Sequence, residues 1–294
     1  MKMSGKGILA LCLTFVSMLR GVADGRADNA LTFESGKIQY AGIEMPYRIA
    51  HVDGTGNPSL VVYLHGGSSK GNDNEKPLNE PATDSISRYL ESRHMESIVL
   101  VPQCPADKSW GGPMLAVLKS LIDKYAEECV DFYIFGGSMG GTGTWSMLSA
   151  YPGLFTAAMP VAGNPSKCDA DQVARTPVFT VMGTADRIMS VEDTSDFIDQ
   201  LHAHHGTAEF EVEEGWTHEM TCIQSYTTRR LDWVFNHRRN PSSIEKATMG
   251  GSERRVVGYY SFDGKALSEP PIKGAYIVRY AGNCGEYSTL KKMK

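Results

Sequence analysis

Short apolar runs without polar interruption recur along the middle of the chain and predict buried β-strands. Longer segments between them repeat apolar residues every three or four positions, the spacing of one face of an α-helix. The expected strands cover residues 60–64, 97–101, 132–135, 157–161 and 177–182. The expected helices cover residues 83–93, 113–125, 142–150, 191–204 and 221–238. This alternation predicts an α/β fold with a largely parallel central sheet and helices on both faces.

Strict alternation of apolar and polar residues marks the two ends of this pattern. Residues 31–40 and 43–50 both alternate, and Ala41-Gly42 between them is suited to a tight turn. The sheet should therefore begin with an antiparallel hairpin. Residues 208–213 alternate in the same way and add a late strand.

The first residues read as a secretory leader. Lys2 and Lys6 precede an apolar run at 8–19, and small residues at 21 and 23 suit cleavage before Asp24. The run is too short for a stable membrane span. The sequence therefore predicts a signal peptide over residues 1–23, an exported protein, and no transmembrane helix.

The composition changes again after the last expected helix, with a boundary expected between residues 238 and 250. We expect a main domain over residues 24–240 and a small β-rich appendage over residues 241–294, with strands at 256–262 and 275–280.

Composition argues against nucleic-acid binding and against a zinc site. The chain has 294 residues, 41% of them hydrophobic, and a formal net charge of −5 with no basic run, so a nucleic-acid groove is not expected. Five cysteines follow the leader without a C-x-x-C pair, which argues against zinc and leaves any disulfide pairing open. They are Cys104, Cys129, Cys168, Cys222 and Cys284. No metal or other cofactor is expected, and the oligomeric state is left open.

The strongest chemical signal is Gly136-Gly-Ser138-Met-Gly140, which lies between an expected strand and an expected helix. This is the G-x-S-x-G pattern of a nucleophile elbow, in which glycines allow a sharp turn that exposes the serine. Ser138 is the expected nucleophile. The backbone N–H of Met139, at the start of the helix, is an expected donor to a developing oxyanion.

A second glycine-rich loop, beginning at His65, follows the strand at 60–64. Its backbone can approach a ligand closely, so the N–H of Gly67 or Ser68 should supply the other oxyanion donor. A phosphate-binding loop is the rival interpretation, but the G-K-[ST] ending is missing. His65 itself is expected to brace the loop.

The partners of the serine should follow in the chain order acid, then histidine. Asp186 lies just beyond the strand at 177–182 and is the expected acid; Asp193, in an expected helix, is the second choice. His218 follows the strand at 208–213 and is the expected general base. Three further histidines crowd a helix end, where a metal site is the less favoured reading: His202, His204 and His205.

The pocket should be open, because residues 162–176 leave no room for an inserted helical cap. Trp110, Trp216 and Met220 lie on loops around the expected mouth and are candidates for its apolar wall. The alternative for all three is ordinary packing.

Together these motifs resemble secreted esterases of the dienelactone-hydrolase and polyhydroxybutyrate-depolymerase-like branch of the α/β-hydrolases, which includes feruloyl and acetyl esterases of carbohydrate esterase family 1 type. The resemblance covers about residues 31–238 and departs at Ser68-Ser-Lys70. It implies a Ser138, His218 and Asp186 triad that hydrolyses a carboxylic ester, here of a feruloyl or acetyl group on a plant-type polysaccharide. It rests on His65-Gly-Gly with Gly71-Asn-Asp-Asn74, Pro102-Gln-Cys-Pro105, Gly136-Gly-Ser-Met-Gly-Gly141, Gly183-Thr-Ala-Asp186 and Thr217-His218.

Two alternatives stay open. One is a serine peptidase of the prolyl-oligopeptidase type, disfavoured because no propeller-sized domain precedes the hydrolase segment. The other is a non-catalytic carbohydrate-binding protein on the same fold. Residues 259–265 and 273–279 resemble C-terminal sorting domains of exported proteins from Bacteroidetes-type bacteria.

Overall fold

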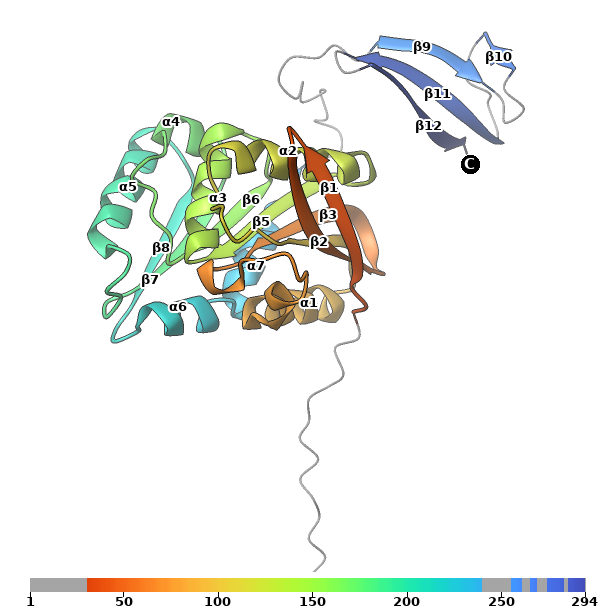
Figure 1. Ribbon diagram of the computed structural model, residues 1–294. Helices are drawn as coiled ribbons and strands as arrows, with labels where there is room; N and C mark the ends of the chain where they lie inside the picture. The colour runs from red at the N-terminus through yellow and green to blue at the C-terminus, as the bar shows by residue number, and fades with distance from the viewer. Residues whose placement is uncertain (1–30, 240–254, 261–264, 269–273, 283–284, 294) are drawn as a thin grey trace, which may run out of the picture. The chain divides into compact units, whose positions relative to one another are not determined.

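An eight-stranded sheet with helices on both faces dominates the computed structural model (Figure 1). The structure describes residues 31–239, 255–260, 265–268, 274–282 and 285–293, so the predicted leader lies outside it. The strand order is β1-β2-β4-β3-β5-β6-β7-β8. The strands are β1 (Glu34–Tyr40), β2 (Ile43–Val52), β3 (Thr55–Leu64), β4 (Met95–Pro102), β5 (Asp131–Gly137), β6 (Ala157–Val161), β7 (Val178–Gly183) and β8 (Ala208–Glu213).

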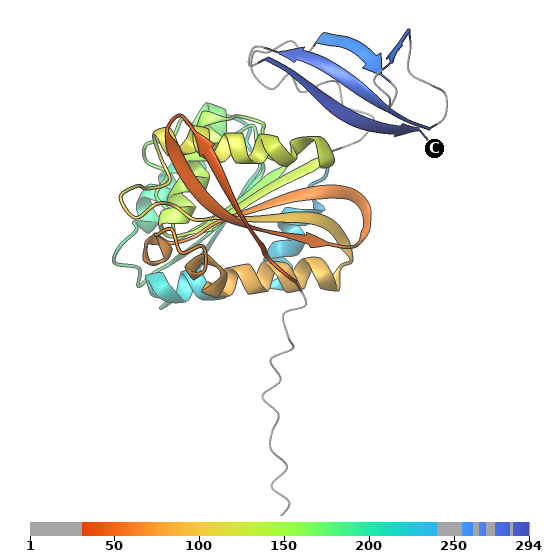
Figure 2. The same ribbon diagram turned by 45° about the vertical axis from the view of Figure 1, so that its right-hand side comes forward.

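The sheet is parallel from β4 through β8, and the prediction of an antiparallel N-terminal hairpin is confirmed. β1 pairs antiparallel with β2, which pairs antiparallel with β4. Ala41 and Gly42 both have positive φ, 49° and 78°, as two-residue hairpin turns require. Figure 2 shows this hairpin, in red, across one edge of the sheet.

The helices form a layer on each face. α2, α3, α4 and α5 lie on one side and α1, α6 and α7 on the other (Figure 1). Their bounds are α1 (Pro81–Ser92), α2 (Pro113–Tyr125), α3 (Met139–Ala150), α4 (Ala170–Val173), α5 (Val191–Ala203), α6 (His218–Gln224) and α7 (Thr228–Asn236), with 3₁₀ turns η1 (Gly67–Ser69), η2 (Lys76–Asn79) and η3 (Ala126–Glu128).

Successive side chains of the central strands feed two separate cores, as the pleat of a strand requires. On β3, Leu60 and Leu64 pack toward α2 and α3, whereas Val61 and Tyr63 pack toward α1 and α7. A strand covered on both faces must be apolar at every position, which is why these strands read as continuous apolar runs.

The expected helix at 221–238 is in fact two helices. α6 starts at His218 and ends at Gln224, and α7 starts at Thr228. Thr227 has extended backbone, φ −79° and ψ 155°, and begins α7 as its N-cap. Tyr226, in the break, is buried against the core of α1 and α7. The burial of this tyrosine accounts for a break that helical periodicity does not show.

A separate four-stranded antiparallel sheet is formed by residues of the expected appendage, in the order β10-β9-β11-β12. Its strands are β9 (Arg255–Tyr260), β10 (Ala266–Leu267), β11 (Gly274–Gly282) and β12 (Gly285–Met293). β9 and β11 overlap the predicted runs, although residues 261 and 262 lie outside the described part. β10 and β12 were not predicted.

The cysteines of the described part are free thiols: Cys104, Cys129, Cys168 and Cys222. Cys284 lies outside the described residues. Burial raises the pKa of each of the four thiols, to about 11 for Cys104 and Cys168 and about 12 for Cys129 and Cys222. Within the described ranges, no helix is long and apolar enough to cross a membrane.

Candidate active site

Ser138 lies at the sharp turn between β5 and α3. Its φ of 58° and ψ of −117° are unfavourable for a residue with a side chain. A Cβ on Gly136 would overlap the Gly140 carbonyl, and a Cβ on Gly140 would overlap the Leu64 carbonyl. The glycines two residues on either side are therefore steric requirements of this turn, as the sequence predicts.

The serine is hydrogen-bonded to His218, and His218 to Asp186. His218 Nε2 lies 2.7 Å from Ser138 Oγ, and His218 Nδ1 lies 2.7 Å from Asp186 Oδ2. A carboxylate only accepts, so Nδ1 donates to Asp186 and Nε2 of the neutral ring accepts from the serine hydroxyl. The Asp186 side chain is fully buried and that of His218 is 12% exposed. The structure thus brings together all three residues expected from the sequence.

The loop of the acid and the loop of the histidine are held together by backbone hydrogen bonds. Thr184 N donates to the Glu213 carbonyl and Ala185 N to the Trp216 carbonyl, each at 3.0 Å. Asp186 Oδ1 accepts from the backbone N–H groups of Ile188 and Met189, at 2.8 and 2.9 Å. Both carboxylate oxygens are therefore committed, which fixes the side chain that orients His218.

The competing acids and histidines lie in other settings. Asp193 is in the first turn of α5, where its N–H donates to the Ser190 hydroxyl. Asp169 caps α4. His204 faces Asp171 at 3.6 Å, and no group of metal-ligating side chains is found among the described residues.

His65 braces the glycine-rich loop beside Ser138. Its Nδ1 donates to the Gly66 carbonyl at 2.6 Å, and its Nε2 accepts the Cys104 N–H at 2.9 Å. Burial lowers the pKa of His65, consistent with the neutral ring that these two bonds need. A Cβ on Gly66 would lie 3.7 Å from Ser138 Cβ, so the loop passes directly beside the serine.

The predicted donors to an oxyanion lie on either side of this contact. Gly67 and Ser68 are the first two residues of the 3₁₀ turn η1, and Met139 is the first residue of α3. Within residues 31–239, the N–H groups of Gly67 and Met139 donate to no protein acceptor. Unpaired N–H groups at the start of a helical turn are suited to bind an anionic oxygen.

A cavity of about 600 Å³ opens onto Ser138 and His218. Polar residues from the loop of η2 line one part of it, including Lys76, Asn79 and Glu80. Ile188 and Ile223 contribute apolar surface and are 68% and 49% exposed. The cavity therefore offers an apolar wall of Ile188 and Ile223 and a polar wall of Lys76, Asn79 and Glu80 beside Ser138.

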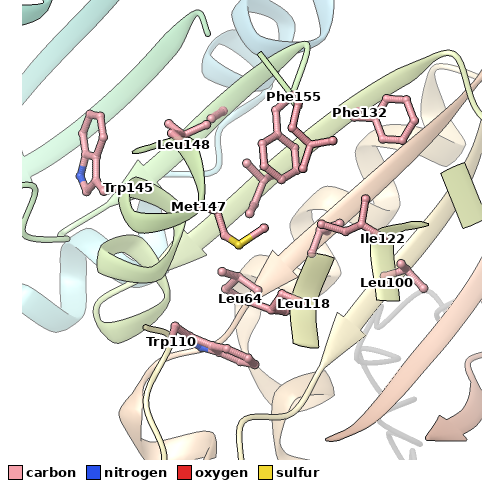
Figure 3. Close-up of a cluster of buried hydrophobic side chains, with 14 of the residues drawn as sticks. Leu64, Leu100, Trp110, Leu118, Ile122, Phe132, Trp145, Met147, Leu148 and Phe155 are labelled. Carbon is pink, nitrogen blue, oxygen red and sulfur yellow. The ribbon is translucent and has the colours of Figure 1, made fainter. Parts of the chain in front are cut away.

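The apolar residues expected at this mouth lie elsewhere. Trp110 is 2% exposed, belongs to the buried core on the α2 and α3 side (Figure 3), and its Nε1 donates to the His65 carbonyl at 3.0 Å. Trp216 packs against the Arg230 guanidinium, 5.7 Å from its ring centroid. Met220 is partly buried, and neither it nor the two tryptophans lines the cavity. For the two tryptophans, the packing alternative describes the observed contacts.

Sequence reasoning missed most of the cavity lining, including Ile188, Ile223 and Glu80. Ile188 is an apolar residue directly after the acid loop, and Ile223 lies on the helix that starts at His218, so proximity to the expected triad was the available signal. Glu80 precedes Pro81 at the start of α1, a position at which a solvent-facing acid is common.

No protein-family model matches the chain, and no curated protein matches it. Among solved structures, a thermostable esterase matches with a TM-score of 0.62 and 27% identity, over 70% of this chain and 63% of that esterase. The chain thus spans less than two thirds of the esterase.

Two further structures, each solved with a ligand bound, are also similar to this chain. The feruloyl esterase module from Clostridium thermocellum, complexed with sinapinate, matches with a TM-score of 0.56 and 15% identity, over 72% of this chain and 91% of the module. Est1E from Butyrivibrio proteoclasticus, with ferulic acid bound, matches with a TM-score of 0.53 and 14% identity, over 69% of this chain and 98% of Est1E. The chain has the α/β-hydrolase fold, and its structural neighbours include esterases.

Proposed function

We propose that this protein is a serine esterase that hydrolyses carboxylic esters through an acyl-enzyme. The observation that carries the proposal is the pair of 2.7 Å contacts joining Ser138, His218 and Asp186, at the wall of an accessible cavity. Ser138 Oγ attacks the ester carbonyl while His218 Nε2 takes its proton, and buried Asp186 stabilises the imidazolium.

The oxyanion that forms on the carbonyl oxygen is held by the N–H of Met139 and that of Gly67 or Ser68. The intermediate collapses when His218 returns the proton to the departing alcohol. Water, deprotonated by His218, then attacks the acyl group and releases the carboxylic acid, which restores Ser138.

For the substrate, we propose an ester of a hydroxycinnamic or short-chain acid on a carbohydrate. Two neighbours that share the fold hold ferulic acid and sinapinate, which motivates this choice of substrate. Ile188 and Ile223 offer apolar surface for an acyl group, and Lys76 and Asn79 offer polar groups for hydroxyls. Residues 162–177 hold the short helix α4 and no inserted cap, which leaves room for a bulky alcohol.

The test combines labelling with a substrate comparison. A fluorophosphonate probe should label the wild-type protein and not Ser138→Ala, and kcat/KM should be compared on methyl ferulate, acetylated xylan, a long-chain p-nitrophenyl ester and a prolyl peptide amide. Absence of labelling in the folded wild type would overturn the esterase. A clear preference for the long-chain ester would overturn only the substrate assignment, whereas a clear preference for the peptide amide would replace the esterase with the peptidase alternative.

The apolar wall has its own test. Ile188→Ser and Ile223→Ser should each raise KM for methyl ferulate, since burying a large aliphatic side chain is worth about 1.5–3 kcal/mol, while kcat changes little. Val212→Ser is the matched control, because Val212 is 43% exposed and lies outside the cavity lining. Equal effects from all three would exclude a specific wall.

We also propose that the enzyme acts outside the cytoplasm. The support is the leader-like sequence over residues 1–23 and the resemblance of the C-terminal segment to sorting domains. In the native host, the mature protein should begin near Asp24 and be recovered outside the cytoplasm, and deletion of residues 241–294 should change its final location. Cytoplasmic recovery with an intact Met1 would contradict export.

A further inference from the structure

We propose that Glu80 is a positioning residue that fixes the oxyanion-binding loop through its carboxylate. This inference rests on the proposed esterase function and adds a fourth side chain to the machinery around Ser138. Glu80 is the N-cap residue of α1, yet its side chain makes no capping bond to that helix. It reaches instead toward the loop at residues 65–70.

The carboxylate binds both ends of the turn that carries Gly67 and Ser68. Glu80 Oε1 accepts the Gly66 N–H at 3.0 Å and the Ser69 hydroxyl at 2.6 Å. Gly66 directly precedes η1 and Ser69 ends it. Two contacts on opposite sides of a short turn restrain the direction in which the N–H groups between them point.

The second oxygen ties this turn to the sheet. Glu80 Oε2 accepts the Tyr63 hydroxyl at 2.5 Å, and Tyr63 lies on β3, just before the loop. Burial, with the nearby Tyr226 and Glu80, raises the pKa of Tyr63 well above its usual range, so the phenol keeps its proton and donates. The two O–H contacts, at 2.5 and 2.6 Å, have the short lengths of charge-assisted hydrogen bonds.

A negative charge beside an oxyanion site would oppose catalysis if it were unpaired. Here the charge of Glu80 is spread over donors from Tyr63, Gly66 and Ser69, and it lies at the N-terminus of α1, where the helix dipole favours an anion. Glu80 lines the same cavity as Ser138. The carboxylate can therefore act as a fixed acceptor without cancelling the positive potential of the free N–H groups.

Loss of this restraint should weaken transition-state binding more than substrate binding. Removing one oxyanion donor costs about 10²–10³ in kcat, and misplacement by about 1 Å costs about 10². For Glu80→Ala we expect kcat on p-nitrophenyl acetate and the affinity for phenylboronic acid, whose serine adduct is tetrahedral, both to fall about 100-fold, with KM within about threefold. Glu80→Gln keeps an acceptor oxygen and should lie between Ala and wild type.

Controls separate positioning from stability. Asp84→Asn removes another carboxylate from the first turn of α1, one that pairs with Arg88 on the surface, and should leave kcat and boronate affinity unchanged. Ser69→Ala removes one clamp contact with a minimal change of shape and should give a smaller fall of the same kind. If Glu80→Ala does not fold, Ser69→Ala and Glu80→Gln together test the positioning role of Glu80.

The outcomes distinguish this inference from the proposed function. Wild-type kcat and boronate affinity in Glu80→Gln and Ser69→Ala would overturn the positioning role while the esterase stands. A rise in KM at constant kcat would also overturn it, since that pattern belongs to substrate binding. Failure of the esterase itself would instead appear as no hydrolysis and no fluorophosphonate labelling of the wild type.

Discussion

Replacing Asp186 with asparagine should abolish most of the proposed esterase activity by reversing the tautomer of His218. Asp186 Oδ1 accepts two backbone N–H groups, from Ile188 and Met189, and these donors can be matched only by the oxygen of an amide. The NH₂ group of the asparagine must then face His218 Nδ1, which becomes an acceptor. Nε2 consequently carries the proton and can no longer accept one from Ser138.

The magnitude follows from the role of this proton. A misplaced tautomer costs on the order of 10⁴ in kcat in enzymes with this arrangement. We expect kcat/KM for Asp186→Asn to fall by about 10³–10⁴, equivalent to about 4–5.5 kcal/mol of transition-state stabilisation. The assay is steady-state hydrolysis of p-nitrophenyl acetate near neutral pH, with thermal unfolding to confirm that the variant is folded.

The matched control is Asp193→Asn, which changes the second-choice acid at the start of α5. Its loss should be within about threefold, since an exposed surface substitution rarely matters. Full activity in Asp186→Asn, or a large loss in Asp193→Asn, would refute the assignment of the acid. Partial activity in Asp186→Asn together with a changed pH profile would instead show that His218 keeps its tautomer without the carboxylate.

Three further predictions concern stability. Buried Asp131 accepts the Arg239 N–H at 2.7 Å and pairs with Arg238. A chain ending at Arg239 should therefore keep its Tm, whereas one ending at His237 loses both of these partners and should lose about 3–5 kcal/mol of its free energy of unfolding. Equal Tm values for the two chains would contradict this. Burial lowers the pKa of His65, so its contribution to the free energy of unfolding is fully present above about pH 6.5 and is lost as pH falls from there through the folded pKa. Urea unfolding of His65→Gln should show a weaker dependence of this free energy on pH, and an unchanged pH dependence would exclude His65 as its source. Trp110→Ala removes a core side chain and should lower the free energy of unfolding by about 3–5 kcal/mol, and with it the Tm. A raised KM with an unchanged Tm would show instead that Trp110 contacts the substrate.

The contact between Ser138, His218 and Asp186 was predictable because the positions of these residues are tied to local requirements. Gly136 and Gly140 are demanded by steric contacts around Ser138, and Asp186 follows the end of a strand that is recognisable from its apolar run. Such patterns depend on residues close by in the sequence, so they can be recognised without knowing how the rest of the chain folds. The layered sheet was predictable for the same reason, since burial on both faces leaves its mark on each strand.

The residues of the pocket wall were not predictable, because their direction is set by distant parts of the chain. Trp110 packs inward where Gly143 on α3 leaves space, since a Cβ on Gly143 would overlap that of the tryptophan. Nothing near Trp110 in the sequence reports this gap. Likewise, Glu80 is an ordinary helix-start acid until the fold brings the Gly66 loop against it. β12 was missed because the charged residues Lys291 and Lys292 suggest a loop. Charged residues are nevertheless common on an edge strand, and β12 is one.

The composition of the observed wall changes what specificity can be expected. Trp110 and Trp216 were expected to form part of the apolar wall, but Trp110 is buried in the core and Trp216 packs against Arg230. The wall that remains is aliphatic, from Ile188 and Ile223, and an aliphatic surface discriminates one methylene by only about 1–3 kcal/mol. Hydrogen bonds to buried polar groups discriminate more sharply. Acyl selectivity should therefore be broad, and Lys76 and Asn79, which line the same cavity but are exposed, should sharpen the choice of substrate only modestly.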